Sequence, residues 1–223
     1  MRQGFAHKIG ERAVVFVGSA HMPNIEAVQF LVKDLAPKCP DIRFHLIGSV
    51  CSAILEAPSN VVLWGVVDDV TKSAVMQSCR LALNPMISGS GSNVKLADYL
   101  GNGLFVVTTE FGQRGYPESV QPHISIAPMS GKEFVQEVYK SLAEPSLYSD
   151  AARQCRRALF ERDLSMQGLA RRFVEVLQGL EVRRKRILYM WPIVMLSPYL
   201  GAQKPISKNL LRHWGIAVDL MLM

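Results

Sequence analysis

The most constraining feature of the sequence is an alternation, beginning at residue 13, between short apolar runs and longer stretches with helical periodicity. Each run is three to six residues long, rich in branched side chains, and followed by residues that break a strand. The runs lie at residues 13–17, 42–47, 61–64, 81–83, 104–109 and 123–127. Strands buried on both faces lack a polar alternation, and helical connections between strands make them parallel. The pattern therefore predicts an α/β fold.

Amphipathic stretches fill the intervals between these strands. Helices are expected at residues 25–35, 70–78, 93–100 and 132–142, with two more before residue 180. Asp68 or Asp69 caps the second of them, because a carboxylate accepts hydrogen bonds from the first amides of a helix. The sequence thus predicts a Rossmann-like, doubly wound parallel sheet followed by C-terminal helices. Three parts are expected: an N-terminal lead-in at 1–12, the domain at 13–180 and a basic, apolar tail at 181–223.

The charge of the chain is concentrated at its end. It carries 25 Lys and Arg residues against 19 Asp and Glu residues, for a formal charge of +6. Seven of the basic residues and two of the acidic residues lie in 181–223, so the rest of the chain is almost balanced. A nearly neutral domain lacks the electrostatic footprint of a nucleic-acid-binding protein. We therefore expect no nucleic-acid partner.

The cysteines and the apolar stretches bear on location. Four cysteines stand far apart, without a C-x-x-C pair or a histidine at ligand spacing, which favours a reduced, cytoplasmic protein without a metal site. The N-terminus has no signal-peptide pattern. The longest apolar stretch, at 187–200, has 14 residues and two prolines, whereas a membrane-spanning helix needs about 20. We expect no transmembrane span.

The loop before the helix at 93–100 is the strongest candidate for a ligand site. It contains Gly89, Ser90, Gly91, Ser92 and Asn93. Glycines allow the main chain to approach a phosphate closely, and the free amides and the dipole of the helix favour a negative charge there. Lys95 adds a positive charge in the first turn, and Asp98, one turn further along, could accept hydrogen bonds from a vicinal diol such as a ribose. Open parallel sheets bind ligands at the edge where the strands reach their carboxyl ends, and this loop follows the carboxyl end of the fourth strand.

A second interpretation of these residues carries equal weight on the sequence alone. Gly- and Ser-rich loops often precede helices, so Lys95 and Asp98 are equally consistent with solvated surface charges behind a capped helix. The loop matches neither the G-x-x-x-x-G-K-[ST] pattern nor a G-x-G-x-x-G pattern after the first strand, which disfavours a P-loop ATPase and a standard dinucleotide site. His21 is more often a rim residue than a catalytic base, and no nucleophile triad is present.

An ordered series of segments resembles one known family. The segments are residues 14–24, 44–48, 61–68, 83–100 and 103–109. In order and spacing they resemble the C-terminal, donor-binding domain of GT-B-type glycosyltransferases of the group 1, family 4-like kind. The resemblance implies binding of a nucleoside-diphosphate sugar, with the diphosphate at 89–93 and the ribose at Asp98. It also implies that Gly18, Ser19 and Gly65 shape the opposite wall.

The sequence departs from this family at several positions. Many members carry two glutamates separated by seven residues, and here Ser90 and Asp98 stand in their places. Many members also hold the diphosphate with an arginine and a lysine after the first strand, whereas this chain has Ser19 and no clear lysine. Neutralisation of the phosphates would therefore fall to loop amides and Lys95. Phe105 replaces a usual proline, which we interpret as a packing difference.

The resemblance covers one half of a two-domain enzyme. GT-B enzymes work in a cleft between two domains, and the N-terminal, acceptor-binding one has no counterpart here. We expect it to be missing from this chain or supplied by another polypeptide, and the chain alone to be inactive. The complete enzyme would transfer a sugar to a saccharide or lipid-linked acceptor in polysaccharide biosynthesis, without metal or cofactor. The alternatives are a non-catalytic nucleotide-sugar-binding or scaffolding module and an unrelated regulatory domain.

The tail allows two interpretations of equal weight. A basic cluster at 183–186 adjoins an apolar, aromatic stretch at 187–191. This combination suits peripheral binding at the inner, anionic face of a membrane, where each basic residue contributes about 1 kcal/mol. The same apolar residues could instead be surface that lacks its partner domain.

Overall fold

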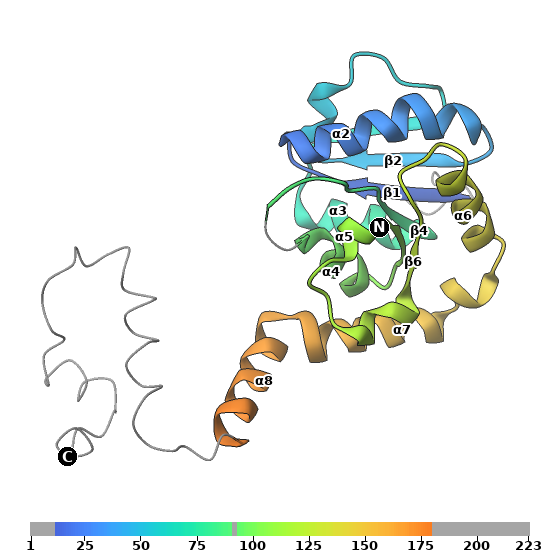
Figure 1. Cartoon of the computed structure of the whole chain (residues 1–223). Helices are drawn as coiled ribbons and strands as arrows, with labels where there is room; N and C mark the ends of the chain where they lie inside the picture. The colour runs from blue at the N-terminus through green and yellow to red at the C-terminus, as the bar shows by residue number, and fades with distance from the viewer. Residues whose placement is uncertain (1–11, 91–92, 180–223) are drawn as a thin grey trace, which may run out of the picture. The chain divides into compact units, whose positions relative to one another are not determined.

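A computed structural model describes residues 12–90 and 93–179. Its centre is a six-stranded sheet in the order β3-β2-β1-β4-β5-β6, in which every neighbouring pair is parallel (Figure 1). The strands are β1 (Ala13–Val17), β2 (Arg43–Ile47), β3 (Val61–Gly65), β4 (Leu81–Asn84), β5 (Phe105–Thr108) and β6 (Ile124–Ile126). The predicted α/β, doubly wound parallel sheet is confirmed, and the strand order reverses between β1 and β4.

Helices connect the strands, and the α-helices are α2 (Met22–Phe30), α3 (Asp69–Ser78), α4 (Val94–Gly101), α5 (Glu110–Gln113), α6 (Glu133–Leu142), α7 (Asp150–Leu159) and α8 (Met166–Gly179). Shorter helical turns are η1 (Leu31–Leu35), η2 (Ala36–Lys38), η3 (Ser49–Ala53), η4 (Glu118–His123), η5 (Pro145–Tyr148) and η6 (Phe160–Leu164). The chain divides into two compact units, of which the first ends at Val174. The second begins at Glu175, and the tail predicted at 181–223 lies outside the described residues. None of the helices described combines the length and the hydropathy needed to span a bilayer.

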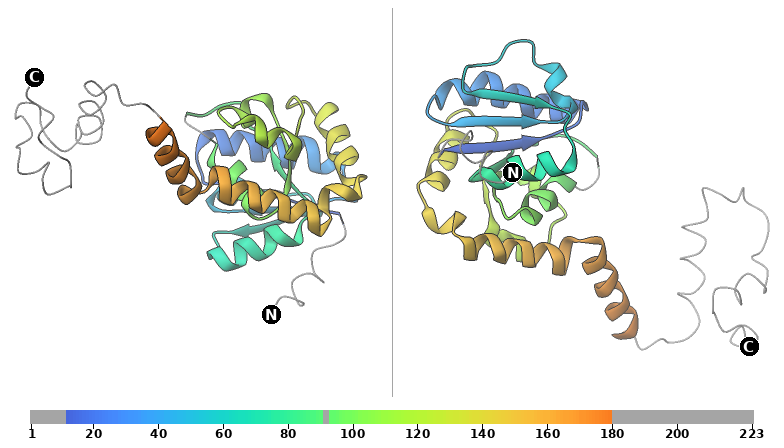
Figure 2. Two further views of the ribbon diagram at one scale, coloured as in Figure 1. Left: turned by 90° about the horizontal axis from the view of Figure 1, so that it is seen from below. Right: turned by 180° about the vertical axis from the view of Figure 1, so that it is seen from behind.

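The sheet lies between two layers of helices, as Figure 2 shows from two sides, and an apolar cluster fills the space on each face of the sheet. Neighbouring side chains of one strand belong to opposite layers, because successive residues of a strand point to opposite faces. In β1, Val14 and Phe16 belong to the layer that α2 and α6 complete. Ala13 and Val15 belong to the layer that α3, α4 and α7 complete. Burial of both faces explains the continuous apolar runs in the sequence.

One polar side chain of the sheet is also buried. His45 of β2 is 2% exposed, and its Nδ1 accepts a hydrogen bond of 2.9 Å from Trp64 Nε1 of β3. Burial, together with the charge of Arg43, lowers the pKa of His45 to about 4, so the ring is neutral at pH 7. His45 is therefore a core residue of the sheet.

Arginines of α7 fix the C-terminal ends of two helices. Arg153 donates to Cys79 O at 2.8 Å, just after α3, and Arg156 donates from Nε to Gly103 O at 3.0 Å, just after α4. Burial and the charge of Arg153 lower the pKa of Arg156 to about 10, which still leaves it cationic at pH 7. Cations are favourable at helix C-termini because of the unpaired carbonyls and the helix dipole. The opposite ends of α3 and α4 lie at the carboxyl edge of the sheet.

The carboxyl ends of β1, β2 and β3 are joined by main-chain hydrogen bonds. Gly18 N donates to Ile47 O at 2.9 Å, Val50 N to Gly18 O at 3.2 Å, and Gly48 N to Gly65 O at 2.7 Å. Gly48 has φ of +105°, and a Cβ at this position would lie far inside van der Waals contact with Gly18 O. The two loops can approach this closely only because residue 48 is glycine.

We predict that Gly48→Ala lowers the free energy of unfolding by about 3 kcal/mol, because it adds a steric clash to a main-chain conformation open only to glycine. Gly65→Ala is the control, since Gly65 has φ of +65° and no atom near the position of a Cβ. That change should cost about 1 kcal/mol. Urea unfolding at equilibrium measures both, and equal losses would contradict the close-approach explanation.

Candidate functional site

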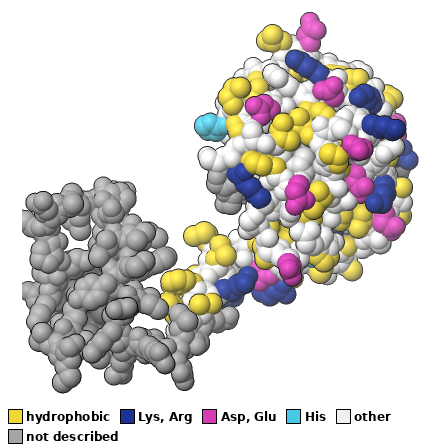
Figure 3. All heavy atoms as spheres, in the orientation of Figure 1, with side chains coloured by type: hydrophobic (Ala, Val, Ile, Leu, Met, Phe, Trp, Pro, Cys, Tyr) yellow, Lys and Arg dark blue, Asp and Glu magenta, His cyan; other side chains and the backbone are white. Residues whose placement is uncertain are grey.

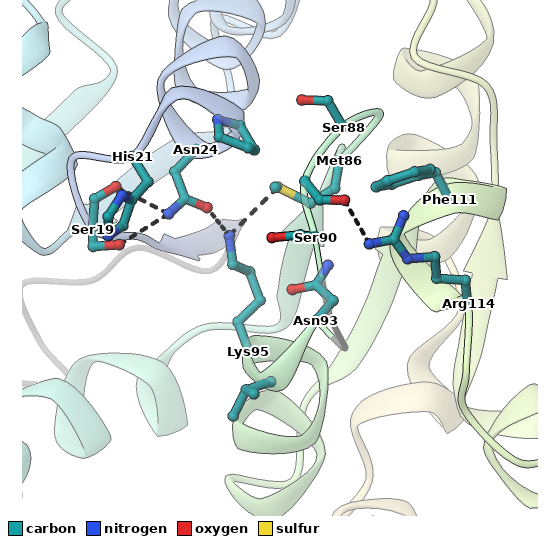
Figure 4. Close-up of a pocket in the computed structure, with 13 residues that line it drawn as sticks. Ser19, His21, Asn24, Met86, Ser88, Ser90, Asn93, Lys95, Phe111 and Arg114 are labelled. Atoms are coloured by element: carbon teal, nitrogen blue, oxygen red, sulfur yellow. Dashed lines mark hydrogen bonds between the residues drawn. The ribbon is translucent and has the colours of Figure 1, made fainter. Parts of the chain in front are cut away.

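A pocket of about 510 Å³ opens at the carboxyl edge of the sheet (Figure 4). Its walls come from the loops that follow β1, β4 and β5 and from the first turns of α2 and α4. The lining residues are Ser19, His21, Pro23, Asn24, Met86, Ser88, Gly89, Ser90, Asn93, Val94, Lys95, Phe111 and Arg114. The strand order reverses between β1 and β4, and open α/β sheets bind ligands in the crevice at such a switch point.

Asn24 organises the wall that follows β1. Its Nδ2 donates to Ser19 O at 3.0 Å and to Ser19 Oγ at 3.2 Å. These bonds turn Oδ1 of Asn24 toward the pocket, where it accepts a hydrogen bond from Lys95 Nζ. Figure 4 shows this chain of contacts running from Ser19 through Asn24 to Lys95. The loop after β1 is thereby linked directly to α4.

Lys95 is the most unusual charge of the site. Its Nζ also donates to Met86 Sδ at 3.4 Å and lies 4.6 Å from the centroid of the Phe16 ring. Burial lowers the pKa of Lys95 to about 8, so the ammonium is still mostly protonated at pH 7. None of its contacts among the described residues is a carboxylate. A partly buried cation with only neutral partners among the described residues is a favourable place for an anion.

The first turn of α4 leaves main-chain donors available. The side chain of Asn93 does not cap the helix; its Nδ2 instead donates to Asn84 Oδ1 at 3.0 Å and to Gly112 O at 3.2 Å. Tyr116 Oη donates to Asn93 O at 2.7 Å and accepts from Ala97 N at 3.1 Å. Within the described part of the chain, the amides of Val94 and Lys95 have no acceptor. These amides and the helix dipole are suited to an anion.

Arg114 forms the wall that follows β5. Its Nη2 donates to Gly89 O at 2.7 Å, and its guanidinium lies 3.8 Å from the centroid of the Phe111 ring. The pocket thus has a lysine and an arginine on two of its walls, and no carboxylate among the lining residues that the structure describes. Neither Arg114 nor Phe111 was among the site residues predicted from the sequence. The only signal was a basic residue between glycines after the fifth strand.

The ten predicted donor-binding residues are distributed unevenly around the pocket. Ser19, Gly89, Ser90, Asn93 and Lys95 line it. Gly18, Gly65 and Asp98 lie at the same edge of the sheet but are not lining residues, and Gly91 and Ser92 are outside the described residues. Asp98 forms an ion pair with Lys72 of α3, with 3.4 Å between Asp98 Oδ2 and Lys72 Nζ. The roles of all ten residues in binding a nucleotide-sugar donor stay predictions.

The remaining polar groups that the sequence singled out have structural places within the described residues. His21 precedes α2 and lines the pocket, while Asp68 caps α3 by accepting a 2.8 Å hydrogen bond from Thr71 N. Hydrogen bonds from Thr71 lower the pKa of Asp68. Across residues 12–90 and 93–179, no group of three or more His, Cys, Asp or Glu side chains is arranged to hold a metal ion. The pocket therefore offers cations and main-chain donors for binding.

Lys95→Met should raise the free energy of unfolding by about 1–2 kcal/mol at pH 7. The pKa of Lys95 is lowered from 10.5 to about 8 in the folded chain. Below pH 8 the fold therefore carries the whole cost of a buried charge, and wild-type stability rises between pH 8 and 10.5 as Lys95 loses its proton. The variant lacks this cost and this pH dependence. Denaturant titrations at several pH values test this, with exposed Lys140→Met as the control. A destabilised Lys95→Met chain would contradict it.

Solved structures share this fold. WaaG, a glycosyltransferase involved in lipopolysaccharide biosynthesis, is 16% identical with a TM-score of 0.54 over 80% of this chain and 51% of its own. HepE from Anabaena, solved with UDP and glucose, is 14% identical with a TM-score of 0.57 over 80% of this chain and 52% of its own. The C-terminal domain of LpcC, a group 1 glycosyl transferase from Francisella tularensis, is 14% identical with a TM-score of 0.51 over 75% of this chain and 94% of its own. The chain thus spans about half the length of WaaG and HepE.

Sequence comparison agrees with the fold. An uncharacterised 44.6 kDa protein in the cps region of Klebsiella pneumoniae is 27% identical over 116 residues, which are 46% of this chain and 30% of that protein. Residues 11–144 match the family model described as glycosyl transferases group 1. This match covers more than half of the chain and includes every strand of the sheet. The chain belongs to the group 1 glycosyl transferases.

Proposed function

We propose that the pocket binds the diphosphate of a nucleoside-diphosphate sugar, and that the chain is the donor-binding half of a glycosyltransferase. The observation that carries this proposal is the pairing of Lys95 with amides at the start of α4 that have no acceptor among the described residues. Lys95 is a partly buried cation without a carboxylate contact in the described part of the chain, and the Val94 amide lies beside it at the same pocket. A diphosphate supplies the negative charge that both groups lack.

Donor binding by a related fold supports this choice of ligand. HepE was solved with UDP-glucose and with UDP and glucose. In a transfer reaction, negative charge develops on the departing diphosphate. Hydrogen-bond donors and cations that already face the position of this charge stabilise it without having to reorganise when the bond breaks. Lys95 and the amides of α4 would have this role here, with Arg114 at the opposite wall.

The complete reaction requires groups that we do not assign to this chain. We propose a saccharide or lipid-linked acceptor, held by an N-terminal domain that is either another polypeptide or a part of a longer chain. WaaG is involved in lipopolysaccharide biosynthesis and the Klebsiella relative is named for the cps region, which makes polysaccharide biosynthesis the proposed setting. We assign no catalytic base, metal or cofactor. Basic and acidic side chains are interspersed on the face that Figure 3 shows, which gives no support to a nucleic-acid partner.

Adding a matching N-terminal domain distinguishes the enzyme from a binding module. A donor-binding half should then hydrolyse or transfer the donor sugar. A scaffolding module would bind nucleotide and produce neither reaction. An unrelated regulatory domain would bind no uridine, guanosine or thymidine diphosphate at all.

We predict that UDP binding weakens as the pH rises above about 8. Burial lowers the pKa of Lys95 to about 8 in the empty pocket, and a bound diphosphate raises it again, so binding takes up a proton above pH 8. The affinity should fall by up to about tenfold per pH unit, until the pKa of the bound state is reached. Calorimetry between pH 7 and 10 measures this affinity. The range lies above the phosphate pKa of about 6, so the phosphates of UDP stay ionised throughout. Lys95→Arg should remove the dependence, and a wild-type affinity that stays constant would contradict it.

Asp98→Ala should weaken UDP binding by about 1–3 kcal/mol, because a charge-assisted hydrogen bond to a ribose hydroxyl is lost. The affinity of Asp98→Ala for inorganic pyrophosphate, which has no ribose, should not change. Asp150→Ala, at the start of α7, is a suitable control for removal of a carboxylate. Unchanged UDP affinity would return Asp98 to the interpretation as a surface charge.

A further inference from the structure

Lys72 connects α3 to α4 at the carboxyl edge of the sheet. Its Nζ lies 3.4 Å from Asp98 Oδ2 and 3.2 Å from Asp69 Oδ1. The side chain of Lys72 is 26% exposed, against 37% for Asp98 and 94% for Asp69. Lys72 is therefore the least exposed member of the group. Its contact with Asp98 joins two elements that are far apart in the sequence.

Asp98 is held from two directions. Lys72 contacts Oδ2, and Asn102 Nδ2 donates to Oδ1 at 3.4 Å and to the main-chain oxygen of Asp98 at 2.8 Å. An ionised carboxylate has about four acceptor positions on its two oxygens. These two contacts leave acceptor capacity for two more donors. The vicinal hydroxyls of a ribose are donors of this kind.

The neighbouring carboxylates keep Lys72 protonated. Partial burial opposes the charge of Lys72, but the carboxylates of Asp98 and Asp69 outweigh it and raise the pKa of Lys72. Lys72 is therefore cationic throughout the neutral range. The carboxylate of Asp98 lies beside this fixed cation, and a carboxylate can accept hydrogen bonds from both hydroxyls of a diol.

Lys72 contrasts with Lys95 at the same edge of the sheet. Lys72 is paired with carboxylates, whereas Lys95 has none among its contacts in the described part of the chain. A cation that is already neutralised is poorly suited to bind phosphate, and well suited to orient the carboxylate that neutralises it. A restraint on the rotamer of Asp98 reduces the entropy lost when a diol binds.

We propose that Lys72 is a positioning residue that holds Asp98 for the 2′- and 3′-hydroxyls of the donor, so that the site selects ribonucleoside over 2′-deoxyribonucleoside diphosphates. The proposal rests on the function proposed above and narrows its substrate class. Uridine and guanosine diphosphate sugars carry both hydroxyls. Thymidine diphosphate sugars lack the 2′-hydroxyl and would be disfavoured donors.

Titrations of the full 223-residue chain with UDP, 2′-deoxy-UDP and inorganic pyrophosphate test this. GDP and 2′-deoxy-GDP serve as a second pair. The wild type should prefer a ribonucleotide over its deoxy counterpart by about tenfold, the value of one good hydrogen bond. Lys72→Met should reduce this preference to about threefold or less and leave pyrophosphate affinity within about twofold. Lys72→Arg should restore most of the preference, because it keeps the cation beside Asp98.

Lys140→Met is the matched control. Lys140 forms an i, i+3 ion pair with Glu137 on α6, as Lys72 does with Asp69 on α3, and it does not line the pocket. The preference of Lys140→Met for ribonucleotides over deoxyribonucleotides should equal that of the wild type. If urea titrations show that Lys72→Met is not folded, Lys72→Gln replaces it, and the same loss of ribose preference is expected.

Three results would overturn the inference while leaving the proposed function intact. They are an equal affinity of the wild type for ribo- and deoxyribonucleotides, an unchanged preference in Lys72→Met, and a tighter binding of UDP by Lys72→Met. The last result would mean that Lys72 competes with the ribose for Asp98. Failure of the proposed function has a different signature, in which the wild type binds none of the nucleotides and no pyrophosphate.

Discussion

The seating of α4 against the sheet is the constraint on which the site depends. Tyr99 is fully buried, and its Oη accepts a 2.8 Å hydrogen bond from Val17 N at the end of β1. Burial raises the pKa of Tyr99. Tyr116 and Asn93 hold the first turn of the helix, and Arg156 of α7 binds the carbonyl of Gly103 beyond its last turn. With both ends of α4 fixed, its first turn, which brings Val94 and Lys95 to the lining of the pocket, is already in place before a ligand binds, and such preorganisation favours anion binding.

The sequence predicts the fold well because the fold depends on a regular pattern. All six strands occur where continuous apolar runs stand, with ends that differ by one residue or less on each side. The helix expected from residue 25 starts three residues earlier, at Met22, because Pro23 fits the first turn of a helix and lies within it. The short helices at 110–113 and 118–123 were not predicted, since each has too few residues to display a period.

The site is predictable only where one local segment makes it. Gly89, Ser90, Asn93 and Lys95 belong to one loop and helix, and all of them line the pocket. Arg114, by contrast, reaches the pocket through the packing of α5 beside β4, which no periodicity encodes. The same is true of the pairing between Lys72 and Asp98, because it joins residues 26 positions apart on two helices. The side-chain contacts of Asn93 show the same limit, because its amide donates to Asn84 of β4 and to Gly112 of α5, which the local sequence does not place beside it.

The surroundings of each cation determine what it can do at this edge. A lysine next to carboxylates gains little from an additional anion, because its charge is already balanced, so Lys72 can affect binding only through Asp98. Lys95 contacts an amide oxygen, a thioether and an aromatic ring, and burial lowers its pKa to about 8. In the proposed function, an incoming diphosphate would balance this charge and would be bound more tightly for it. The departure from the family pattern at Ser19 is consistent with this proposal, in which the cation that would meet the phosphates stands on α4 instead of on the loop after β1.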